Sequence, residues 1–314
     1  MSVGALGEFA LIDRIAALAS DAQDRQVVLG IGDDAALLRP RRGHDVVVTT
    51  DAFVEGVHFR FADESARTAG RRAMVANLSD LAAMGAAPLG CTLALSTPPA
   101  ARVADVLGLV RGLLAEAARA GCPLVGGNVT RGRDLSLAVT AIGQLRAGHA
   151  LRRDAARPRD RVLVTGTLGR SALERRRGRV RTVPEPRLAI GRALARARWR
   201  GACIDVSDGL VRDLGHLARA SGVLIRVDSD AVPRPRGFSQ ACAAAGADPD
   251  QLALEGGEDW ELVFTTRPGA PRAAVLAARY GVAVTEIGRV FAGPPALQWE
   301  GAARPSADGG WRHF

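Results

Sequence analysis

The sequence contains no lysine, and all 42 of its basic residues are arginines. An enzyme that forms a Schiff base with its substrate needs a lysine, and so does the Walker-type loop that binds nucleotide phosphates. Both of these classes are therefore excluded for this chain.

Aromatic residues are also scarce, at 4% of the 314 residues. A formal net charge of +9 would suit a nucleic-acid ligand. However, the sequence shows no basic helix and no base-stacking motif. The densest basic run, Arg175–Arg181, lies near prolines and is predicted to be a solvent-exposed loop. We therefore predict no nucleic-acid partner.

Cysteines are few and scattered. The four thiols, at Cys91, Cys122, Cys203 and Cys242, form no CxxC pair. Because the four cysteines are also far apart in the sequence, zinc clusters and disulfide frameworks are both poor interpretations. Each thiol has small or apolar neighbours, which predicts four buried and unreactive cysteines.

Long apolar runs are absent as well. No run approaches the roughly 18–20 residues that a membrane-spanning helix needs. The first residues have no basic start and include Glu8 and Asp13, which is unlike a secretory signal. We therefore expect no membrane partner and a cytoplasmic location. With 47% hydrophobic residues, the chain can still bury a sizeable core.

A polar, arginine-rich segment at 146–161 divides the chain. Helix-like and strand-like patterns occur on both sides of it, which predicts an α+β fold with domains at 1–148 and 149–314. The first half should contain helices at 11–18, 66–84 and 102–120 and strands at 45–51, 91–96 and 135–145. The second half should contain strands at 162–166 and 223–228, a tight turn after 203–206, and helices at 187–199 and 209–220.

Several acidic residues stand at the ends of apolar segments, next to Gly, Ser or Thr, instead of on solvated faces. They are Asp33, Asp34, Asp51, Asp80, Asp205, Asp208, Glu258 and Asp259. Gathering carboxylates in one place is costly unless cations are present. Oxygen ligands without His or Cys clusters favour Mg²⁺, or else Mn²⁺ or Ca²⁺, over zinc. Because Mg²⁺ commonly bridges carboxylates and phosphates, the pattern predicts a polyphosphate ligand.

Helix capping is the alternative role for any single one of these acids, since Asp and Ser side chains accept hydrogen bonds from free backbone amides. Ser79–Asp80 precedes an apolar segment, and Asp208 precedes Gly209 and Leu210, so both places suit a helix start. Capping therefore stays open for individual residues, while the set as a whole favours a metal–phosphate site.

Glycine-rich segments at 30–32, 125–128, 165–169 and 255–257 would let backbone amides approach phosphate oxygens closely. A tight turn is the more common use of one such segment. None of the four matches the P-loop, Rossmann or protein-kinase patterns, so the chain does not belong to the commonest ATP-binding folds.

A series of motifs, taken in order, resembles the thiamine-monophosphate kinase family, part of the aminoimidazole-ribonucleotide synthetase-like superfamily. The motifs run from residue 7 to 314 and are GEF, GIGDDAAL, TTDAFVEGVHF, NLSDLAAMGA, GGNVTRG, IDVSDGL, GGEDWEL and WRHF. Any one of them could arise by chance, but the ordered set is highly specific.

The resemblance implies the two-domain fold of that superfamily, in which the N-terminal sheets of two chains pair into a barrel across a homodimer. The N-terminal domain would bind ATP and Mg²⁺ and form the dimer, and the C-terminal domain would complete the nucleotide and substrate site. The implied activity is transfer of a phosphoryl group from ATP to thiamine monophosphate, giving thiamine diphosphate, with several Mg²⁺ ions bound.

The resemblance also implies roles for individual residues. The Mg²⁺ positions are Asp34, Thr49, Thr50, Asp51, Asp80, Asp205 and Asp208. The ATP-contacting positions are Gly127, Asn128, Arg153 and Ser207. The positions that hold thiamine monophosphate are His58, Glu258 and Trp311. A structural hydrogen bond is the alternative role for His58, and packing of the chain end is the alternative for Trp311. No residue is assigned as an acid or base, because a phosphate oxygen is already a competent nucleophile.

One departure from the family pattern falls inside the implied site. The family's GGD is GGN at 126–128, so Asn128 stands where a carboxylate is usual. An amide oxygen can still bind Mg²⁺ but brings no charge, which should weaken one metal site. The segment after TGTLGRSA is also shortened.

Two groups of rivals remain. The first is another ATP-using member of the superfamily. The hydrogenase-maturation dehydratase would end in a reactive cysteine, selenophosphate synthetase would use an N-terminal Cys or selenocysteine with Lys, and the purine-pathway cyclase lacks VEGVHF together with GGEDWEL. The second rival is a degenerate ligand-binding homologue without activity, for which Asn128 would be the signature.

Overall fold

The structure is a computed structural model that describes residues 1–19, 26–31, 35–306 and 309–310. Contacts group the chain into two compact units. The first comprises 1–81, 86–148 and 179–184, and the second comprises 82–85, 149–178 and the described residues from 185 onward. The two-domain division at 148 and 149 stays a prediction. Within the described residues, no helix is both long and apolar enough to cross a membrane.

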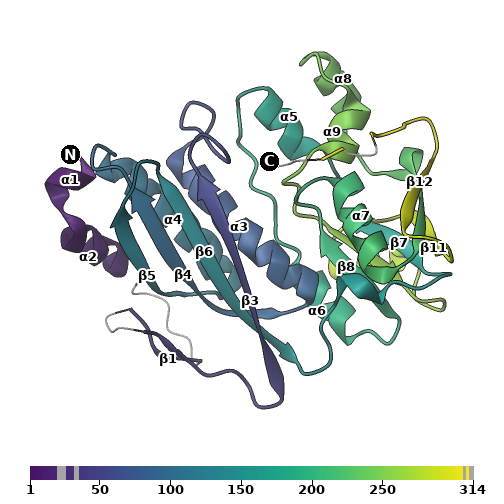
Figure 1. The fold of residues 1–314 in the computed structure, drawn as a ribbon, viewed down its shortest axis with the longest axis horizontal. Helices are drawn as coiled ribbons and strands as arrows, with labels where there is room; N and C mark the ends of the chain where they lie inside the picture. The colour runs from purple at the N-terminus through teal and green to yellow at the C-terminus, as the bar shows by residue number, and fades with distance from the viewer. Residues whose placement is uncertain (20–25, 32–34, 307–308, 311–314) are drawn as a thin grey trace. The chain divides into compact units, whose positions relative to one another are not determined.

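The first unit is built on a four-stranded sheet with the strand order β3-β6-β4-β5 (Figure 1). Its strands are β3 (His44–Val54), β4 (Ala87–Thr97), β5 (Leu124–Arg131) and β6 (Ser136–Arg146). β4 and β5 run parallel, and the other neighbours are antiparallel. The same unit contains helices α1 (Val3–Leu6) and α2 (Glu8–Ala19) and the short pair β1 (Val27–Leu29) and β2 (Leu37–Leu38).

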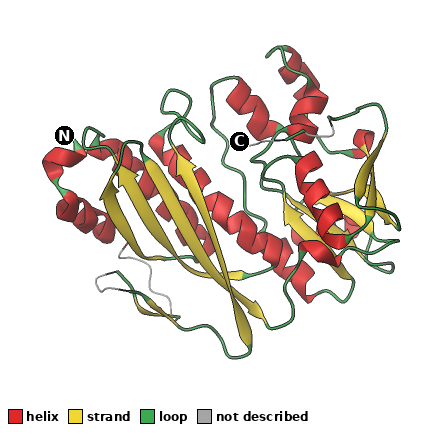
Figure 2. Cartoon of the chain, viewed as in Figure 1, coloured by secondary structure: helices red, strands yellow, loops and turns green. Residues whose placement is uncertain are grey.

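Two long helices, α3 (Ala66–Met84) and α4 (Val103–Ala120), lie across one face of this sheet (Figures 1 and 2). They cross so closely that a Cβ added to Gly70 would lie 1.8 Å from the Leu109 carbonyl oxygen. Both helices end at a glycine in the left-handed region, Gly85 after α3 and Gly121 after α4. The predicted helices at 66–84 and 102–120 are therefore confirmed, because their apolar spacing and glycine stops are local signals.

The other face of the sheet carries exposed apolar side chains at its edge. On β3, Val46 is 52% and Val48 is 64% exposed, whereas Phe53 is buried. Residues that alternate along a strand point to opposite faces. Thr49, Asp51 and Phe53 therefore share one face of β3, and Val46, Val48 and Thr50 share the other.

The second unit contains a six-stranded sheet with the order β12-β9-β11-β7-β10-β8. Its strands are β7 (Arg161–Thr165), β8 (Arg200–Asp205), β9 (Leu224–Asp228), β10 (Leu262–Thr266), β11 (Val284–Phe291) and β12 (Ala296–Glu300). Only β12 and β9 run parallel among its pairs. Its helices are α5 (Arg170–Arg176), α6 (Leu188–Arg196), α7 (Leu210–Ser221), α8 (Phe238–Ala243), α9 (Pro249–Glu255) and α10 (Ala273–Tyr280), with 3-10 turns at Arg153–Ala155 and Ser229–Ala231.

The prediction that the basic run is a solvent-exposed loop is wrong at its beginning. Arg175 and Arg176 are the last two residues of α5. The physical reason lies just upstream, where Ala172 and Leu173 are buried and hold the helix against the unit. The predicted burial of the four cysteines is confirmed.

Candidate active site

In the first unit, a threonine and an aspartate meet between β3 and α3. The Thr49 Oγ1 donates a hydrogen bond to Asp80 Oδ2 at 2.5 Å. Asp51 lies two residues after Thr49 on the same strand, so its side chain points to the same face. The structure therefore brings Thr49, Asp51 and Asp80 to one side of the sheet.

The Thr50 hydroxyl is not part of this group. Its Oγ1 donates to the Val139 carbonyl oxygen at 3.1 Å and accepts a hydrogen bond from Thr140 Oγ1 at 3.1 Å. Alternation along β3 places this side chain on the opposite face from Asp51. The metal-ligand role predicted for Thr50 therefore cannot use its side chain on the Asp51 side.

Helix capping is the wrong explanation for Ser79 and Asp80. Both residues lie near the C-terminal end of α3, far from its free amides, and Ser79 is fully buried. An acid close to the C-terminal end of a helix gains nothing from the helix dipole. The helix dipole therefore does not account for Asp80, whose carboxylate accepts the hydrogen bond from Thr49.

Gly127 and Asn128 lie on β5, next to an apolar pocket. The pocket is lined from α2 by Ile12, Ile15 and Ala16, and by apolar residues of β4 and β5. A Cβ on Gly127 would lie 2.1 Å from the Leu93 carbonyl oxygen, so only glycine fits there. Both residues are exposed, and their polar groups stand at the side of an apolar cavity. An apolar cavity with a few polar groups at its side has the usual composition of a small-molecule pocket.

His58 lies in the turn after β3. Its Nδ1 accepts a hydrogen bond from the Val54 amide at 3.1 Å, and its ring centre is 5.3 Å from that of Phe53. Because Nδ1 is the acceptor, a neutral ring carries its proton on Nε2. The structural hydrogen bond considered for His58 is therefore present, and a role in substrate binding stays a prediction.

In the second unit, two loops are joined at the ends of neighbouring strands. The segment after β8 contains Val206 and Ser207, and the segment before β10 contains Glu258 and Trp260. The Glu258 amide donates to the Ser207 carbonyl at 2.8 Å, and the Trp260 amide donates to the Val206 carbonyl at 2.9 Å. A Cβ on Gly257 would lie 2.3 Å from the Ser207 carbonyl oxygen. Ser207 and Glu258 are thus brought together, and Asp205 ends β8 two residues before Ser207.

Asp213 supports the first of these loops and was not singled out from the sequence. Its Oδ2 accepts hydrogen bonds from the amides of Ser207 at 3.0 Å and Asp208 at 3.1 Å. Burial raises the pKa of Asp213 well above its usual value, and the charges of Asp205 and Asp208 raise that pKa further. The only feature of the sequence that could have pointed to this role is the position of Asp213 in the first turn of the helix that follows IDVSDGL.

The capping role considered for Asp208 is also wrong. The residue at the start of α7 is Gly209, which has φ of +112° and supplies no side-chain cap. The Asp208 carboxylate lies 3.4 Å from the Arg212 guanidinium instead.

Arg153, one of the predicted ATP residues, is exposed in the turn beside α7. Its backbone carbonyl accepts a hydrogen bond from Ser221 Oγ at 2.7 Å.

The segment 255–261 has an unusual backbone. Glu258 and Trp260 have φ of +65° and +48°, in the left-handed region that non-glycine residues rarely adopt. Asp259, between them, is buried and accepts hydrogen bonds from the amides of Gly169 at 2.6 Å and Ser171 at 3.2 Å. Such strain persists only where surrounding contacts enforce it, and it is common at functional sites.

The Glu258 carboxylate forms an ion pair with Arg175 of α5. The Nη2 of Arg175 also donates to the Gly257 carbonyl at 3.0 Å. Glu261, three residues later, is buried and receives two hydrogen bonds of 2.6 Å from Arg187 and one of 2.6 Å from Thr165 Oγ1. Sequence reasoning missed both arginine partners, because each pair joins residues that are far apart along the chain.

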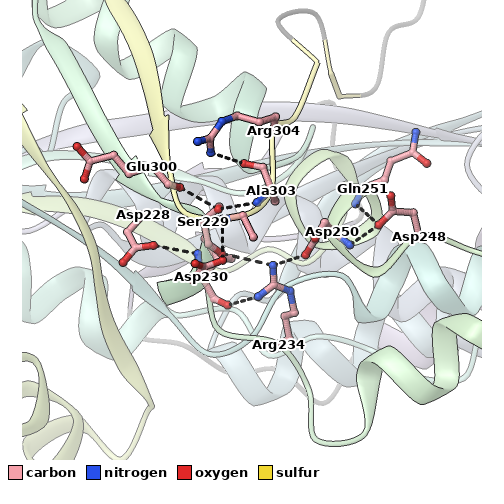
Figure 3. Close-up of polar contacts among 12 residues, drawn as sticks. Asp228, Ser229, Asp230, Arg234, Asp248, Asp250, Gln251, Glu300, Ala303 and Arg304 are labelled. Atoms are coloured by element: carbon pink, nitrogen blue, oxygen red, sulfur yellow. Dashed lines mark hydrogen bonds and ion pairs between the residues drawn. The ribbon is translucent and has the colours of Figure 1, made fainter.

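The segment after β12 is attached to the same unit by a polar network (Figure 3). Ser229 Oγ donates to the Glu300 carbonyl at 2.9 Å and accepts from the Ala303 amide at 3.1 Å. Arg234 binds Asp250 on α9 at 2.5 Å. Further along, the Ser306 amide donates to Glu255 Oε1 at 2.8 Å. The chain is thus held against α9 up to Ser306.

The predicted metal and substrate residues are only partly covered by the structure. Asp34 and Trp311 lie outside the described residues. Asp51 and Asp80 belong to the first unit, and Asp205 and Asp208 belong to the second. Among the described residues, no three acidic, histidine or cysteine side chains are grouped closely enough to hold a metal by themselves.

Comparison with known proteins identifies close relatives. Residues 32–145 match the family model described as AIR synthase related protein, N-terminal domain. A thiamine-monophosphate kinase from Synechococcus elongatus is 36% identical over 306 residues, with 90% of this chain and 91% of the relative covered.

Solved structures agree. The crystal structure of thiamine-monophosphate kinase from Stenotrophomonas maltophilia has a TM-score of 0.82 and 40% identity, covering 97% of this chain and 99% of the other. AaThiL complexed with AMPPCP and TMP has a TM-score of 0.74 and 29% identity, with 100% and 99% covered. The fold is therefore the mixed α/β fold of AIR synthase-related proteins, as expected. The described residues show no closed sheet, so the barrel is not seen in the single chain.

The buried Asp259 generates a prediction about pH. Burial raises the pKa of Asp259 to about 7, against the opposing effect of the hydrogen bonds from Gly169 and Ser171. In the unfolded chain this group ionises near pH 4, so between pH 4 and 7 the folded state holds a proton that the unfolded state has lost. The contribution of Asp259 to stability is therefore present at low pH and is lost as pH rises to about 7.

Urea unfolding of the wild type and of Asp259→Asn at pH 5, 6, 7 and 8 measures this effect. The stability of the wild type relative to the variant should fall by at most about 1.4 kcal/mol for each pH unit up to about 7 and then stay constant. Parallel pH profiles for the two proteins would show that Asp259 does not titrate in this range.

Proposed function

The chain belongs to the thiamine-monophosphate kinase family, and we propose that it transfers the γ-phosphoryl group of ATP to thiamine monophosphate, giving thiamine diphosphate and ADP. The observation that carries this proposal is the near-complete coverage by such kinases at 36–40% identity. The chemistry of the described residues supports it, because each unit contributes carboxylates and an apolar pocket lies beside Gly127 and Asn128.

The oxygen-rich residues fit Mg²⁺. Thr49, Asp51 and Asp80 offer hard oxygen ligands on one face of the first unit, and Asp205 and Asp208 offer them in the second. Asp34 and the backbone of Thr50 complete the proposed set. Mg²⁺, when bound to these residues, would neutralise negative charge on the phosphates. Burial raises the pKa of Asp213, and the charges of Asp205 and Asp208 raise it further, so a cation bound at Asp205 and Asp208 would reduce the repulsion among these carboxylates.

ATP and thiamine monophosphate are proposed to use different parts of the two units. Gly127 and Asn128 would contact ATP, with its base in the apolar pocket beside α2, and Arg153 and Ser207 would contact its phosphates. His58, Glu258 and Trp311 would hold thiamine monophosphate. Phosphoryl transfer between these two substrates needs alignment and charge neutralisation more than proton transfer, so no acid or base is assigned.

The N-terminal domain, 1–148, is proposed to pair with its copy in a homodimer, while 149–314 completes the site. The edge strand β3 supports this proposal. It exposes Val46 and Val48 on the sheet face that α3 and α4 do not cover. An exposed edge with apolar side chains favours pairing with another chain. The protein is further proposed to act in the cytoplasm.

The activity test combines the wild type with one site variant. With ATP, Mg²⁺ and thiamine monophosphate, the purified wild type should produce thiamine diphosphate and ADP in equal amounts. Asp80→Ala should abolish turnover, because a proposed metal ligand is lost. The melting temperature should change little, because Asp80 is only partly buried and a hydrogen bond such as the one from Thr49 contributes modestly to stability.

The exposed Asp13 on α2 provides the matched control, and Asp13→Ala should keep full activity. A folded wild type that forms no thiamine diphosphate at any Mg²⁺ concentration would overturn the proposed function. An Asp80→Ala protein that fails to fold would instead make Asp80 a structural residue.

The alternative of an inactive, ligand-binding homologue is favoured only by Asn128. Asn128→Asp restores the carboxylate of the family pattern, so it should keep or raise the rate and lower the Mg²⁺ concentration needed for half-maximal activity. Initial rates across a Mg²⁺ titration measure both quantities. A clear loss of activity in this variant would show that the amide is required at this position.

The dimer is tested at the exposed edge of β3. Val48→Glu places a charge on a side chain that is 64% exposed, and it should shift the protein from dimer to monomer in sedimentation velocity. Val275→Glu, on the 53% exposed Val275 of α10, is the matched control and should leave the dimer intact. A wild type that sediments as a monomer would refute the dimer.

A further inference from the structure

The basic run at Arg175–Arg181 has no role in the function proposed above, yet its first arginine is directed inward. The Arg175 side chain is 34% exposed and forms an ion pair with Glu258, whose side chain is 19% exposed. The same guanidinium donates to the Gly257 carbonyl at 3.0 Å. Arg175 therefore contacts both the side chain and the backbone of the segment that carries a proposed substrate residue.

The helix that carries Arg175 is itself fixed to that segment. The Asp259 carboxylate accepts hydrogen bonds from Gly169 and Ser171 at the start of α5. A Cβ on Gly256 would lie 2.5 Å from the Ala172 Cβ, so the helix packs directly against the loop. Ala172 and Arg175 are three residues apart and lie on the same side of the helix. The approach of Arg175 to Glu258 is thus imposed by packing.

Glu258 needs such support because its backbone is in the left-handed region, with φ of +65°. Its amide is held by the Ser207 carbonyl at 2.8 Å, which fixes the backbone but leaves the long side chain to other contacts. A planar guanidinium that binds the carboxylate and the preceding carbonyl together restricts this side chain to one direction. A carboxylate can accept about four hydrogen bonds, so the contact with Arg175 does not saturate it.

We infer that Arg175 is a positioning residue that sets the affinity for thiamine monophosphate by orienting the Glu258 carboxylate. The inference rests on the proposed function. Arg175, the first residue of the basic run, therefore affects the binding of thiamine monophosphate by holding Glu258 and does not contact the substrate itself.

The first experiment compares Arg175→Ala with Arg176→Ala. Arg176 is the next residue of α5, is exposed and carries the same charge, so it is the matched control. Arg175→Ala should raise the KM for thiamine monophosphate about fivefold, a size typical of a partly exposed ion pair, and leave the KM for ATP unchanged. Arg176→Ala should match the wild type in both constants.

A double-mutant cycle shows whether Arg175 acts through Glu258. Alanine keeps the backbone demands of a non-glycine residue, so Glu258→Ala removes the carboxylate alone. In the Glu258→Ala background, Arg175→Ala should cause no further rise in the KM for thiamine monophosphate. Equal and additive effects of the two substitutions would overturn the inference.

Arg175→Lys keeps the charge but cannot bind two acceptors in the guanidinium geometry, so it should give an intermediate KM. It also provides the test if Arg175→Ala does not fold. Calorimetric titration of the wild type and the variants with thiamine monophosphate gives the same comparison without turnover.

Three results would overturn the inference: an unchanged KM in Arg175→Ala, a lower KM, or an equal rise in the KM values of both substrates. A lower KM would mean that Arg175 competes with the substrate for Glu258. Failure of the proposed function would be seen differently, because the wild type itself would then neither bind nor phosphorylate thiamine monophosphate.

Discussion

The arrangement of the second unit depends on the backbone pairing between the segments that leave β8 and enter β10. These strands are antiparallel neighbours, with Leu262 opposite Asp205, and their pairing continues beyond the sheet through the Val206–Trp260 and Ser207–Glu258 hydrogen bonds. Continuing it requires two non-glycine residues in the left-handed region, at a cost of about 1–3 kcal/mol each. The buried Asp259 offsets part of this cost by accepting two backbone hydrogen bonds.

One consequence is that several carboxylates lie near one another around this loop. Asp213 is buried so that it can hold the amides of Ser207 and Asp208, and its pKa is raised by burial and by Asp205 and Asp208. Asp213 therefore fixes the geometry of the loop and at the same time lies close enough to Asp205 and Asp208 for their charges to repel its own. Carboxylates that lie near one another repel, and a bound cation would lower that repulsion.

The sequence predicted the features that have local causes. The helix at 66–84 follows from apolar periodicity and from Gly85, and both are visible in a short window. Capping at Asp80 was wrong because an acid before an apolar segment looks the same at the start of a helix and near its end. Arg175 and Asp213 were missed because their partners are set by sheet register and helix packing, which no local pattern encodes. The roles of Asp51, Asp205 and Glu258 rest on motif order and remain predictions.

The absence of lysine has a structural counterpart in the second unit. Arg175 binds Glu258 and the Gly257 carbonyl, Arg187 binds both carboxylate oxygens of Glu261, and Arg267 binds Asp160 and the Ala155 carbonyl. Each contact uses two nitrogens of one planar group, whereas an ammonium acts as a point charge. An arginine in these places therefore fixes a direction as well as a charge. Glu258 follows a glycine and has a strained backbone, and the guanidinium of Arg175 holds its carboxylate and the preceding carbonyl in a defined geometry.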